Sequence, residues 1–194
     1  MWLQEVILEG NEVQLIPLRE SHREGLLKAA SDGELWNLWF TSVPSEANID
    51  TYIQTALNDQ KAGRALPFTI LDKATNTIIG STRYCNVPLD QKRVEIGYTW
   101  YAKSFQRTAK NTEAKLLLLS HAFETLQCIA VEFRTHVENS ASRNAIARLG
   151  AKQDGILRQH QQLANGSFRD TVVFSILNNE WQQVKEHLTN RLTK

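Results

Sequence analysis

The clearest pattern of apolar and polar positions lies in the middle of the chain. Val94, Ile96 and Tyr98 alternate with the polar residues Glu95 and Thr99. A period of two is typical of a strand with one buried face. We therefore expect a strand here, with the three apolar side chains on one side of the sheet and the two polar ones on the other.

A longer apolar segment follows this strand after a short polar turn. Residues 114–123 contain four consecutive leucines flanked by alanine and phenylalanine, which predicts a helix packed against a sheet. The turn, residues 106–111, leads directly into this helix. The free N–H groups and dipole of a helix N-terminus suit it to an anion such as phosphate. Arg107 and Lys110 add positive charge there.

Similar patterns predict the other elements. Alternating and β-branched residues predict strands at 12–18, 67–71, 78–87, 129–137, 153–159 and 170–177. Apolar stripes predict helices from Ser21 to a break at Asp32 and Gly33, from Ser45 as N-cap to about Ala62, over 140–149 before Gly150, and over 179–192. Residues 35–40 are expected to form a short helix or turn, and the last two strands a hairpin around Asn165 and Gly166.

This order of elements predicts one mixed domain. Three strands form a meander before the leucine-rich helix, and strand, helix and hairpin follow it, which indicates an α/β or α+β fold with a mixed sheet flanked by helices. The 194 residues are enough for a single domain spanning 1–194 with a sizeable core.

Composition narrows the classes of function. A net charge of +1 argues against nucleic acid as the main partner. No apolar run is long enough to span a membrane, and the N-terminus lacks the cationic start of a secretory signal. Cys85 and Cys128 are expected to be buried free thiols, as in a cytoplasmic protein. The His and Cys residues are not clustered in a pattern that would predict a metal site.

The last third of the chain carries motifs that resemble a known family. Asn139 and Ser142 form an N-x-x-S pattern, a helix ending in Leu-Gly-Ala closes at 149–151, and Asp-Gly-Ile-Leu-Arg follows at 154–158. Asp170, a strand and Glu-Trp at 180–181 complete the order. This resembles GNAT-family N-acetyltransferases of the RimJ/RimL type, which acetylate ribosomal-protein N-termini, and the resemblance covers nearly the whole chain.

The resemblance implies an acyl-CoA N-acyltransferase fold with acetyl-CoA as co-substrate. Its pyrophosphate loop, Q/R-x-x-G-x-G/A, corresponds to residues 106–111, with Ala109 and Asn111 at the glycine positions. Alanine is tolerable there if its φ stays negative, and asparagine suits an unusual φ or a helix N-cap. The coenzyme residues implied in this way are Trp100, Tyr101, Gln106, Arg107, Thr108, Ala109, Lys110, Asn111, Thr112, Asn139 and Arg143.

Two residues are candidates for proton transfer. The resemblance places Glu95 near the family's catalytic glutamate, where it would accept the amine's proton or hold the ammonium. Its alternative is an exposed carboxylate or a cross-strand ion pair with Arg83. Ser142 matches the serine that protonates the leaving thiolate, and its alternative is a first-turn serine that satisfies backbone. Many relatives use a tyrosine where this chain has Ile146.

The acceptor site is expected between the early helices and the last hairpin. Candidate acceptor residues are Trp36, Trp39, Tyr52 and Arg83, with Phe40 beside them. Packing in the core explains the aromatic residues equally well. His136 is a further candidate base but is better explained as structural.

By resemblance, the expected reaction is direct attack of a primary amine on acetyl-CoA in a ternary complex. A protein N-terminus is the first expected acceptor and a small-molecule amine the second. A non-catalytic acyl-CoA sensor is the alternative from another class. The sequence leaves the assembly open between a monomer and a homodimer.

Overall fold

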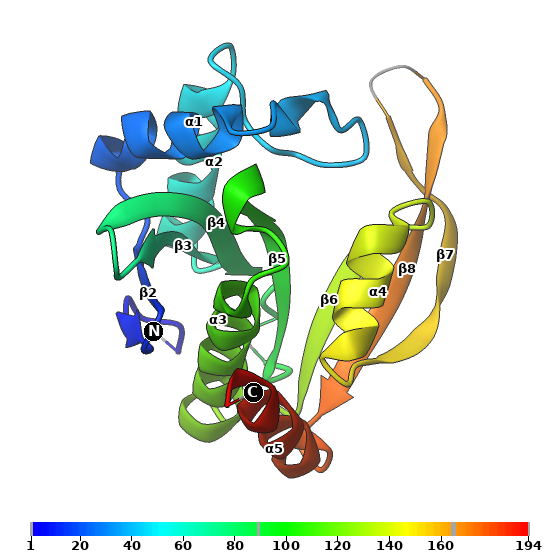
Figure 1. Ribbon diagram of the computed structural model, residues 1–194. Helices are drawn as coiled ribbons and strands as arrows, with labels where there is room; N and C mark the ends of the chain where they lie inside the picture. The colour runs from blue at the N-terminus through cyan, green and yellow to red at the C-terminus, as the bar shows by residue number, and fades with distance from the viewer. Residues whose placement is uncertain (1, 89, 164–165, 194) are drawn as a thin grey trace.

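A computed structural model of the chain describes residues 2–88, 90–163 and 166–193. One eight-stranded sheet runs through the molecule in the order β1-β2-β3-β4-β5-β6-β8-β7 (Figure 1). Its strands are β1 (Leu8–Glu9), β2 (Val13–Pro17), β3 (Leu66–Asp72), β4 (Thr77–Cys85), β5 (Arg93–Tyr101), β6 (Ala130–His136), β7 (Lys152–Gln162) and β8 (Phe168–Leu177). Every neighbouring pair is antiparallel except β5 and β6, which are parallel. The expected mixed, mostly antiparallel sheet is confirmed.

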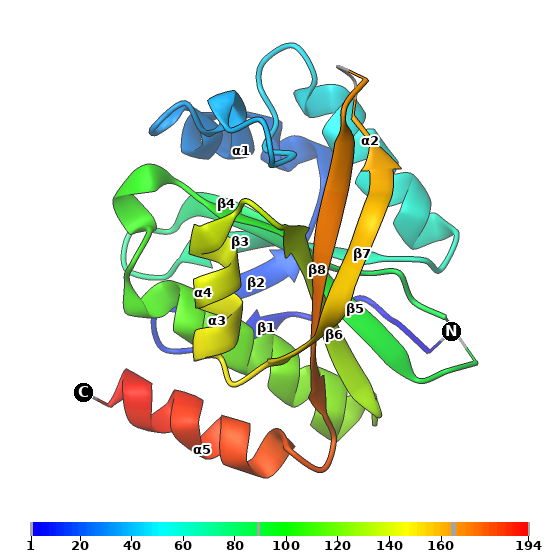
Figure 2. The ribbon, with the colours of Figure 1, turned by 90° about the vertical axis from the view of Figure 1, so that its right-hand side faces the viewer.

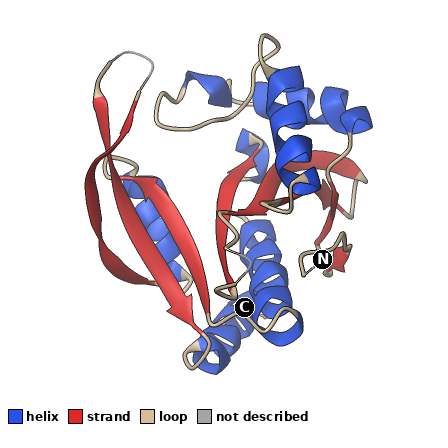
Figure 3. Ribbon diagram, turned by 180° about the vertical axis from the view of Figure 1, so that it is seen from behind, coloured by secondary structure: helices blue, strands red, loops and turns tan. Residues whose placement is uncertain are grey.

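Five α-helices cover the two faces of this sheet in the described part of the chain. They are α1 (Arg23–Ser31), α2 (Ile49–Lys61), α3 (Ala109–Ser120), α4 (Ser140–Arg148) and α5 (Trp181–Leu192). Helices α1 and α2 lie over β4 and β3, and α3 packs on β2 and against α5 (Figure 3). Helix α4 runs beside β6, and the β7–β8 hairpin extends toward the end of the molecule that carries α1 and α2 (Figure 2).

Apolar burial follows this division into two faces. The larger cluster joins the sheet to α3 and α5 through side chains such as Tyr84, Leu118 and Phe133. A second cluster joins α1 and α2 to the other face, and Trp100 belongs to it. Cys85 and Cys128 are buried free thiols, as expected from the sequence.

Strands β5 and β6 pair only over their first residues. Arg93, Val94 and Glu95 face Ala130, Val131 and Glu132, and no pairing continues beyond them. The two strands then diverge, as Figure 1 shows. The edge of β5 from Ile96 onward therefore faces a gap in the sheet, which we call the splay.

A β-bulge in β5 lies beside the splay. Against β4, Ser81 is paired with Trp100 and Arg83 with Gly97, so one residue is extra on β5. The extra residue is Tyr98, whose φ of 52° lies in the left-handed region. Bulges bend a strand and increase its twist, which fits the divergence of β5 from β6.

Because of the bulge, the predicted assignment of side chains to the two faces of the sheet is wrong for the second half of β5. Val94 and Ile96 do pack in the larger core. Tyr98 instead points to the opposite face, where the guanidinium of Arg83 stacks on its ring. Thr99 turns the other way and bonds to Lys115 of α3. One extra residue exchanges the two faces for every position beyond it.

The start of α2 also differs from the sequence prediction. The helix begins at Ile49 with Asn48 as N-cap, and Ser45 is not its cap. The Asn48 side chain instead accepts a 2.7 Å hydrogen bond from the backbone N–H of Ser45, closing a turn before the helix. Asn165, expected at the tip of the last hairpin, lies outside the described residues.

Candidate functional site

The loop before α3 presents an open helix N-terminus. Thr108 is the N-cap and Ala109 the first helical residue. The first N–H groups of an α-helix have no partner within the helix, so they are available to an anion. Gln106 braces the loop, because its Nε2 donates a 3.0 Å hydrogen bond to the carbonyl oxygen of Tyr101 at the end of β5.

The two glycine positions of the loop take ordinary conformations. Neither Ala109 nor Asn111 has a positive φ; within the loop only Arg107 does, at 61°. Asn111 is the third residue of α3, so its interpretation as an N-cap is wrong. The left-handed residue of the loop thus lies two residues before the first glycine position.

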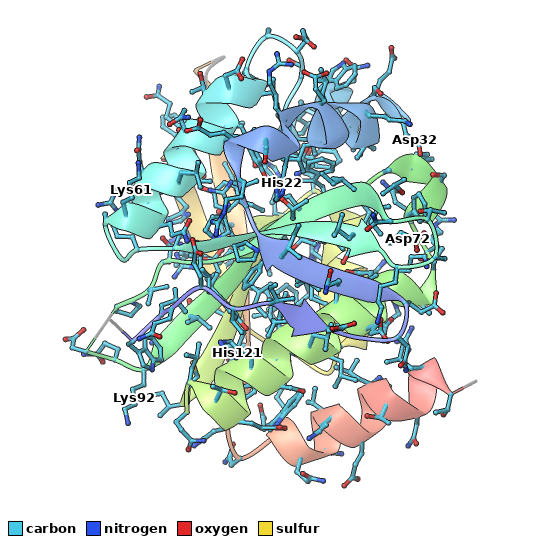
Figure 4. The ribbon with its side chains drawn as sticks, turned by 90° about the vertical axis from the view of Figure 1, so that its left-hand side faces the viewer. His22, Asp32, Lys61, Asp72, Lys92 and His121 are labelled. Carbon is cyan, nitrogen blue, oxygen red and sulfur yellow. The ribbon has the colours of Figure 1, made fainter. Side chains whose placement is uncertain are left out.

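The two cationic side chains of this loop, Lys110 and Arg107, differ in whether they form ion pairs. Lys110 Nζ lies 2.6 Å from Asp72 Oδ1 and 2.8 Å from Glu12 Oε2, and these bonds raise the pKa of Lys110. Figure 4 labels Asp72 at the end of β3. Lys110 can therefore offer an anion its backbone N–H, while its ammonium is neutralised. Arg107 is exposed and forms no ion pair within the described residues.

Helix α1 is tied to the same loop. Asp32 Oδ2 accepts hydrogen bonds from the backbone N–H of Ser104 at 2.9 Å and from its hydroxyl at 2.6 Å. These bonds lower the pKa of Asp32. In Figure 4 Asp32 lies where α1 meets the segment that precedes α3. The contact fixes the early helices relative to the loop.

The opposite wall of the splay is formed by β6 and α4. Asn139 caps α4, since its Oδ1 accepts a 3.0 Å hydrogen bond from the N–H of Ser142. Ser142 is half-buried in the first turn. Arg143 Nη1 donates to the carbonyl oxygen of Val137 at 3.1 Å, which holds its side chain against the end of β6. Asn139 is therefore the N-cap of α4.

Glu95 lies at the point where β5 and β6 separate. Its side chain is buried, Asn86 Nδ2 donates to Oε2 at 2.6 Å, and Arg134 Nε of β6 lies 3.4 Å from the same oxygen. The cross-strand ion pair with Arg83 that the sequence allowed is not formed. A carboxylate thus sits at the base of the splay, held by one amide and one guanidinium.

Trp100 and Tyr52 are joined by hydrogen bonds. Trp100 Nε1 donates to the Tyr52 hydroxyl at 3.2 Å, which donates to Ser81 Oγ at 3.3 Å. Both donors are satisfied, so these side chains are fixed structural parts of the α2 face. The Tyr52 ring nevertheless faces the guanidinium of Arg83, 5.1 Å from its centroid.

The tryptophans expected in the acceptor pocket have different environments. Trp36 packs against the second core cluster. Trp39 is 56% exposed and meets the ring of His136 edge-on, with centroids 4.8 Å apart. Trp39 therefore links the segment after α1 to the end of β6 beside the splay. Its ring also contacts Phe40 edge-on.

His136 is buried at the end of β6. Its Nδ1 accepts a 3.0 Å hydrogen bond from the backbone N–H of Glu138, so in the neutral ring the proton lies on Nε2. That Nε2 is buried and has no partner among the described residues. It is an unused donor beside the splay, which suits it to bind an oxygen.

Sequence reasoning missed several residues of this region. Asn86 and Arg134 hold Glu95, and Lys115 reaches Thr99 from α3. The alternation of Glu132 and Arg134 on β6 was a signal for side chains on one face. The contact of Arg134 with Glu95 depends on the parallel register of β5 and β6, which no local pattern encodes.

Comparison with known proteins identifies the family. The family described as acetyltransferase (GNAT) domain matches residues 12–152. The chain belongs to the GNAT acetyltransferases. It is 31% identical over 152 residues to YdaF of Bacillus subtilis (strain 168), which is named as a ribosomal N-acetyltransferase; the match covers 76% of this chain and 80% of YdaF.

Solved structures agree with this family. A GCN5-related N-acetyltransferase from Brucella melitensis superposes with a TM-score of 0.89 at 30% identity, covering 99% of this chain and 87% of that one. Mycobacterium smegmatis RimJ, solved in complex with CoA-disulfide, shares the fold with a TM-score of 0.77 at 22% identity, covering 96% and 92%. The RimJ/RimL-like resemblance found in the sequence is confirmed.

The described residues contain neither a candidate metal cluster nor a candidate membrane-spanning helix. No group of three or more His, Cys, Asp or Glu side chains in them is placed to hold a metal ion. None of the described helices is both long and apolar enough to cross a membrane.

Proposed function

We propose that this acetyltransferase, acting as one domain over residues 1–194, moves acetyl from acetyl-CoA to a primary amine by direct attack in a ternary complex. The observation that carries the proposal is the splay. Pairing of β5 with β6 ends at Glu95 and Glu132, and the open N-terminus of α3 lies beyond the end of β5. An extended ligand with a pyrophosphate at one end matches this arrangement.

The residues present fit the coenzyme. The N–H groups at the start of α3, residues 108–111, are the donors for the pyrophosphate, and the exposed Arg107 adds charge. The β5 edge near Trp100 and Tyr101 supplies backbone groups to the pantetheine. Two buried polar atoms without a described partner support a polar ligand here: His136 Nε2 on β6 and Arg143 Nε on α4.

The reaction needs a neutral amine and a protonated leaving group. The neutral amine nitrogen attacks the thioester carbonyl and forms the C–N bond, the C–S bond breaks as the coenzyme leaves as a thiolate, and the nitrogen loses its second proton to solvent. Glu95, at the base of the splay, accepts the ammonium proton directly or through water. Ser142 donates a proton to the thiolate and regains one from solvent. Cys85 is no nucleophile in this scheme, since burial raises the pKa of its thiol well above the usual range.

The acceptor we favour is the N-terminal amine of a protein in the cytoplasm. The name of YdaF as a ribosomal N-acetyltransferase supports this choice. A small-molecule amine is the second candidate acceptor. A sensor that binds acyl-CoA without turnover is the second candidate function, favoured by Ala109 and Asn111 at the glycine positions and by Ile146 at the tyrosine position.

Calorimetric titration with acetyl-CoA is the first test. Wild-type protein should bind with micromolar affinity, and Ala109→Glu should lose that binding, because a carboxylate would face the pyrophosphate at the helix N-terminus. Ala74→Glu makes the same change in an exposed turn and should bind like wild type. Release of free coenzyme A in an amine screen then separates the enzyme from the sensor. Failure of wild type to bind would refute both.

A further inference from the structure

Arg83 of β4 is a buried cation without a counterion. Its exposed fraction is 3%, its Nε has no partner, and it takes part in no ion pair among the described residues. The neighbouring Arg134 differs, because it contacts the carboxylates of both Glu95 and Glu132. Burial of an unpaired charge is costly, so an arginine left in this state indicates a partner outside the chain.

Two aromatic rings hold the guanidinium in place. Its central carbon lies 3.9 Å from the centroid of the Tyr98 ring and 5.1 Å from that of Tyr52. Cation–π contacts of this kind offset part of the desolvation cost and leave the N–H edges of the guanidinium free. Tyr98 reaches this face only because of the bulge at its own backbone, where φ is 52°.

The guanidinium lies on the same face of the sheet as Glu95. Cys85 is paired with Glu95, and Arg83 with Gly97, two positions along β5. Two residues along a strand span roughly 7 Å. A group bound at Arg83 would therefore lie a few bonds from an amine held at Glu95.

Gly97 places no side chain on the surface between Glu95 and Arg83. A Cβ at this position would lie 3.2 Å from Glu95 Oε1 and 3.0 Å from Cys85 Sγ. The absence of a side chain leaves room beside the Glu95 carboxylate, on the line from Glu95 to Arg83. Glycine at this position therefore keeps a side chain from crowding the Glu95 carboxylate.

A third cation reinforces this face. Arg169 of β8 donates from Nε to Thr171 Oγ1 at 3.1 Å. Burial lowers its pKa, and the nearby Glu95 charge partly opposes that effect. The surroundings of Glu95 therefore include guanidinium groups from β4, β6 and β8.

We propose that Arg83 binds a carboxylate carried by the amine acceptor, so that the enzyme selects acidic acceptors. This inference rests on the proposed function, because it places the acceptor amine at Glu95. The carboxylate forms a bidentate pair with the guanidinium between Tyr52 and Tyr98. A neutral acceptor would leave the buried charge unpaired and would bind less well.

The test compares acceptors that differ only in this charge. Initial rates are measured with the C-terminally amidated peptides Asp-Ala-Ala and Asn-Ala-Ala, with Ser-Asp-Ala and Ser-Asn-Ala, and with β-alanine and its amide. Wild type should prefer the acid in at least one pair by roughly 30-fold or more in kcat/KM. Preference in the peptide pairs indicates a protein acceptor, and preference in the β-alanine pair alone a small molecule.

Variants then assign the preference to Arg83. Arg83→Met should reduce the acid-to-amide ratio to near one, and Arg83→Lys should keep part of it because the charge remains. Arg64→Met removes an exposed arginine near the end of α2 and should leave the ratio unchanged. Equal rates with acid and amide in wild type would overturn the inference without any variant.

Binding separates this inference from the proposed function. Calorimetry with N-acetyl-Asp-Ala-Ala and N-acetyl-Asn-Ala-Ala amides needs no turnover. Acid binding that Arg83→Met abolishes, with no acetylation of any amine, would support the carboxylate site and refute the proposed reaction. Acetylation of amines without a preference for acids would support the proposed reaction and refute the carboxylate site.

Discussion

The ammonium of Lys115 donates a 2.7 Å hydrogen bond to Thr99 Oγ1, directly beyond the bulge of β5. The side chain is buried, reaches to 5.9 Å from the centroid of the Phe133 ring, and has no carboxylate partner in the described part of the chain. Burial lowers the pKa of Lys115 to about 7. At pH 7 the folded protein therefore holds this amine about half protonated, whereas the unfolded chain would protonate it fully.

Stability should therefore rise with pH relative to a variant without this amine. Between pH 7 and the ordinary lysine pKa of 10.5, the unfolded state binds more protons than the folded one. In that window the free energy of unfolding of wild type should gain up to about 1.4 kcal/mol per pH unit over that of Lys115→Met. Below pH 7 both states are charged and the difference should be constant.

Urea unfolding at pH 6, 7.5, 8.5 and 9.5 measures this difference. Lys61→Met changes an exposed lysine at the end of α2. Its free energy of unfolding should change with pH in parallel with that of wild type. Parallel curves for Lys115→Met as well would show that the buried lysine keeps its ordinary pKa.

The bulge marks the limit of what local pattern can predict. The strand expected around Val94, Ile96 and Tyr98 is present as β5, because alternation and β-branched residues encode it. The exchange of Tyr98 and Thr99 between faces could not be predicted, because it depends on the pairing of β4 with β5. That exchange brings Tyr98 to Arg83 and Thr99 to Lys115.

Glu113 should contribute strongly to stability. Its carboxylate accepts hydrogen bonds of 2.8 Å from the backbone N–H groups of Asn11, Glu12 and Val13, so α3 is fastened to the start of β2. Glu113→Gln removes the charge and forces a donor toward other donors. We expect a loss of about 3 kcal/mol in the free energy of unfolding.

Chemical denaturation of Glu113→Gln and Glu46→Gln provides the comparison. Glu46 is 71% exposed, and its change should alter stability by less than about 0.5 kcal/mol. Equal stability of the two variants would show that the three N–H groups are satisfied equally well by water.

Arg107 should carry both a charge effect and a backbone effect. Its φ of 61° lies in the left-handed region that favours glycine. Arg107→Gly should therefore be more stable than Arg107→Ala by about 1 kcal/mol. Both variants lose the same charge, so both should bind acetyl-CoA more weakly than wild type, and more so at low salt.

Thermal unfolding and calorimetric titration of the two variants separate these effects. Equal melting temperatures would contradict the backbone effect. Unchanged coenzyme affinity in both would show that the arginine does not contact the phosphates.

The sequence predicted where the candidate site lies better than it predicted the roles of the side chains there. The order of motifs located the loop at 106–111, and the open helix N-terminus lies there. The side chains could not be assigned, because their partners come from distant strands. Lys110 is held by Glu12 and Asp72, and Glu95 by Arg134, over sequence separations that periodicity does not report.

Glu95 should control the chemical step. Glu95→Gln keeps the shape of the side chain and removes its capacity to accept a proton, so kcat should fall by about 10²-fold or more, with a smaller change in KM. If the carboxylate only holds the ammonium, KM should rise with kcat nearly unchanged. Steady-state rates of coenzyme A release across pH 6–9 distinguish the two roles.

The matched control for this substitution is Glu138→Gln, an exposed carboxylate in the turn between β6 and α4. It should keep wild-type rates. Melting temperatures of both variants show whether the loss reflects folding, because Glu95→Gln also leaves Arg134 without one of its carboxylates. Wild-type kcat and KM in a folded Glu95→Gln protein would exclude Glu95 as the proton acceptor. The amine would then have to reach the splay already neutral, and the rate would follow the titration of the acceptor itself.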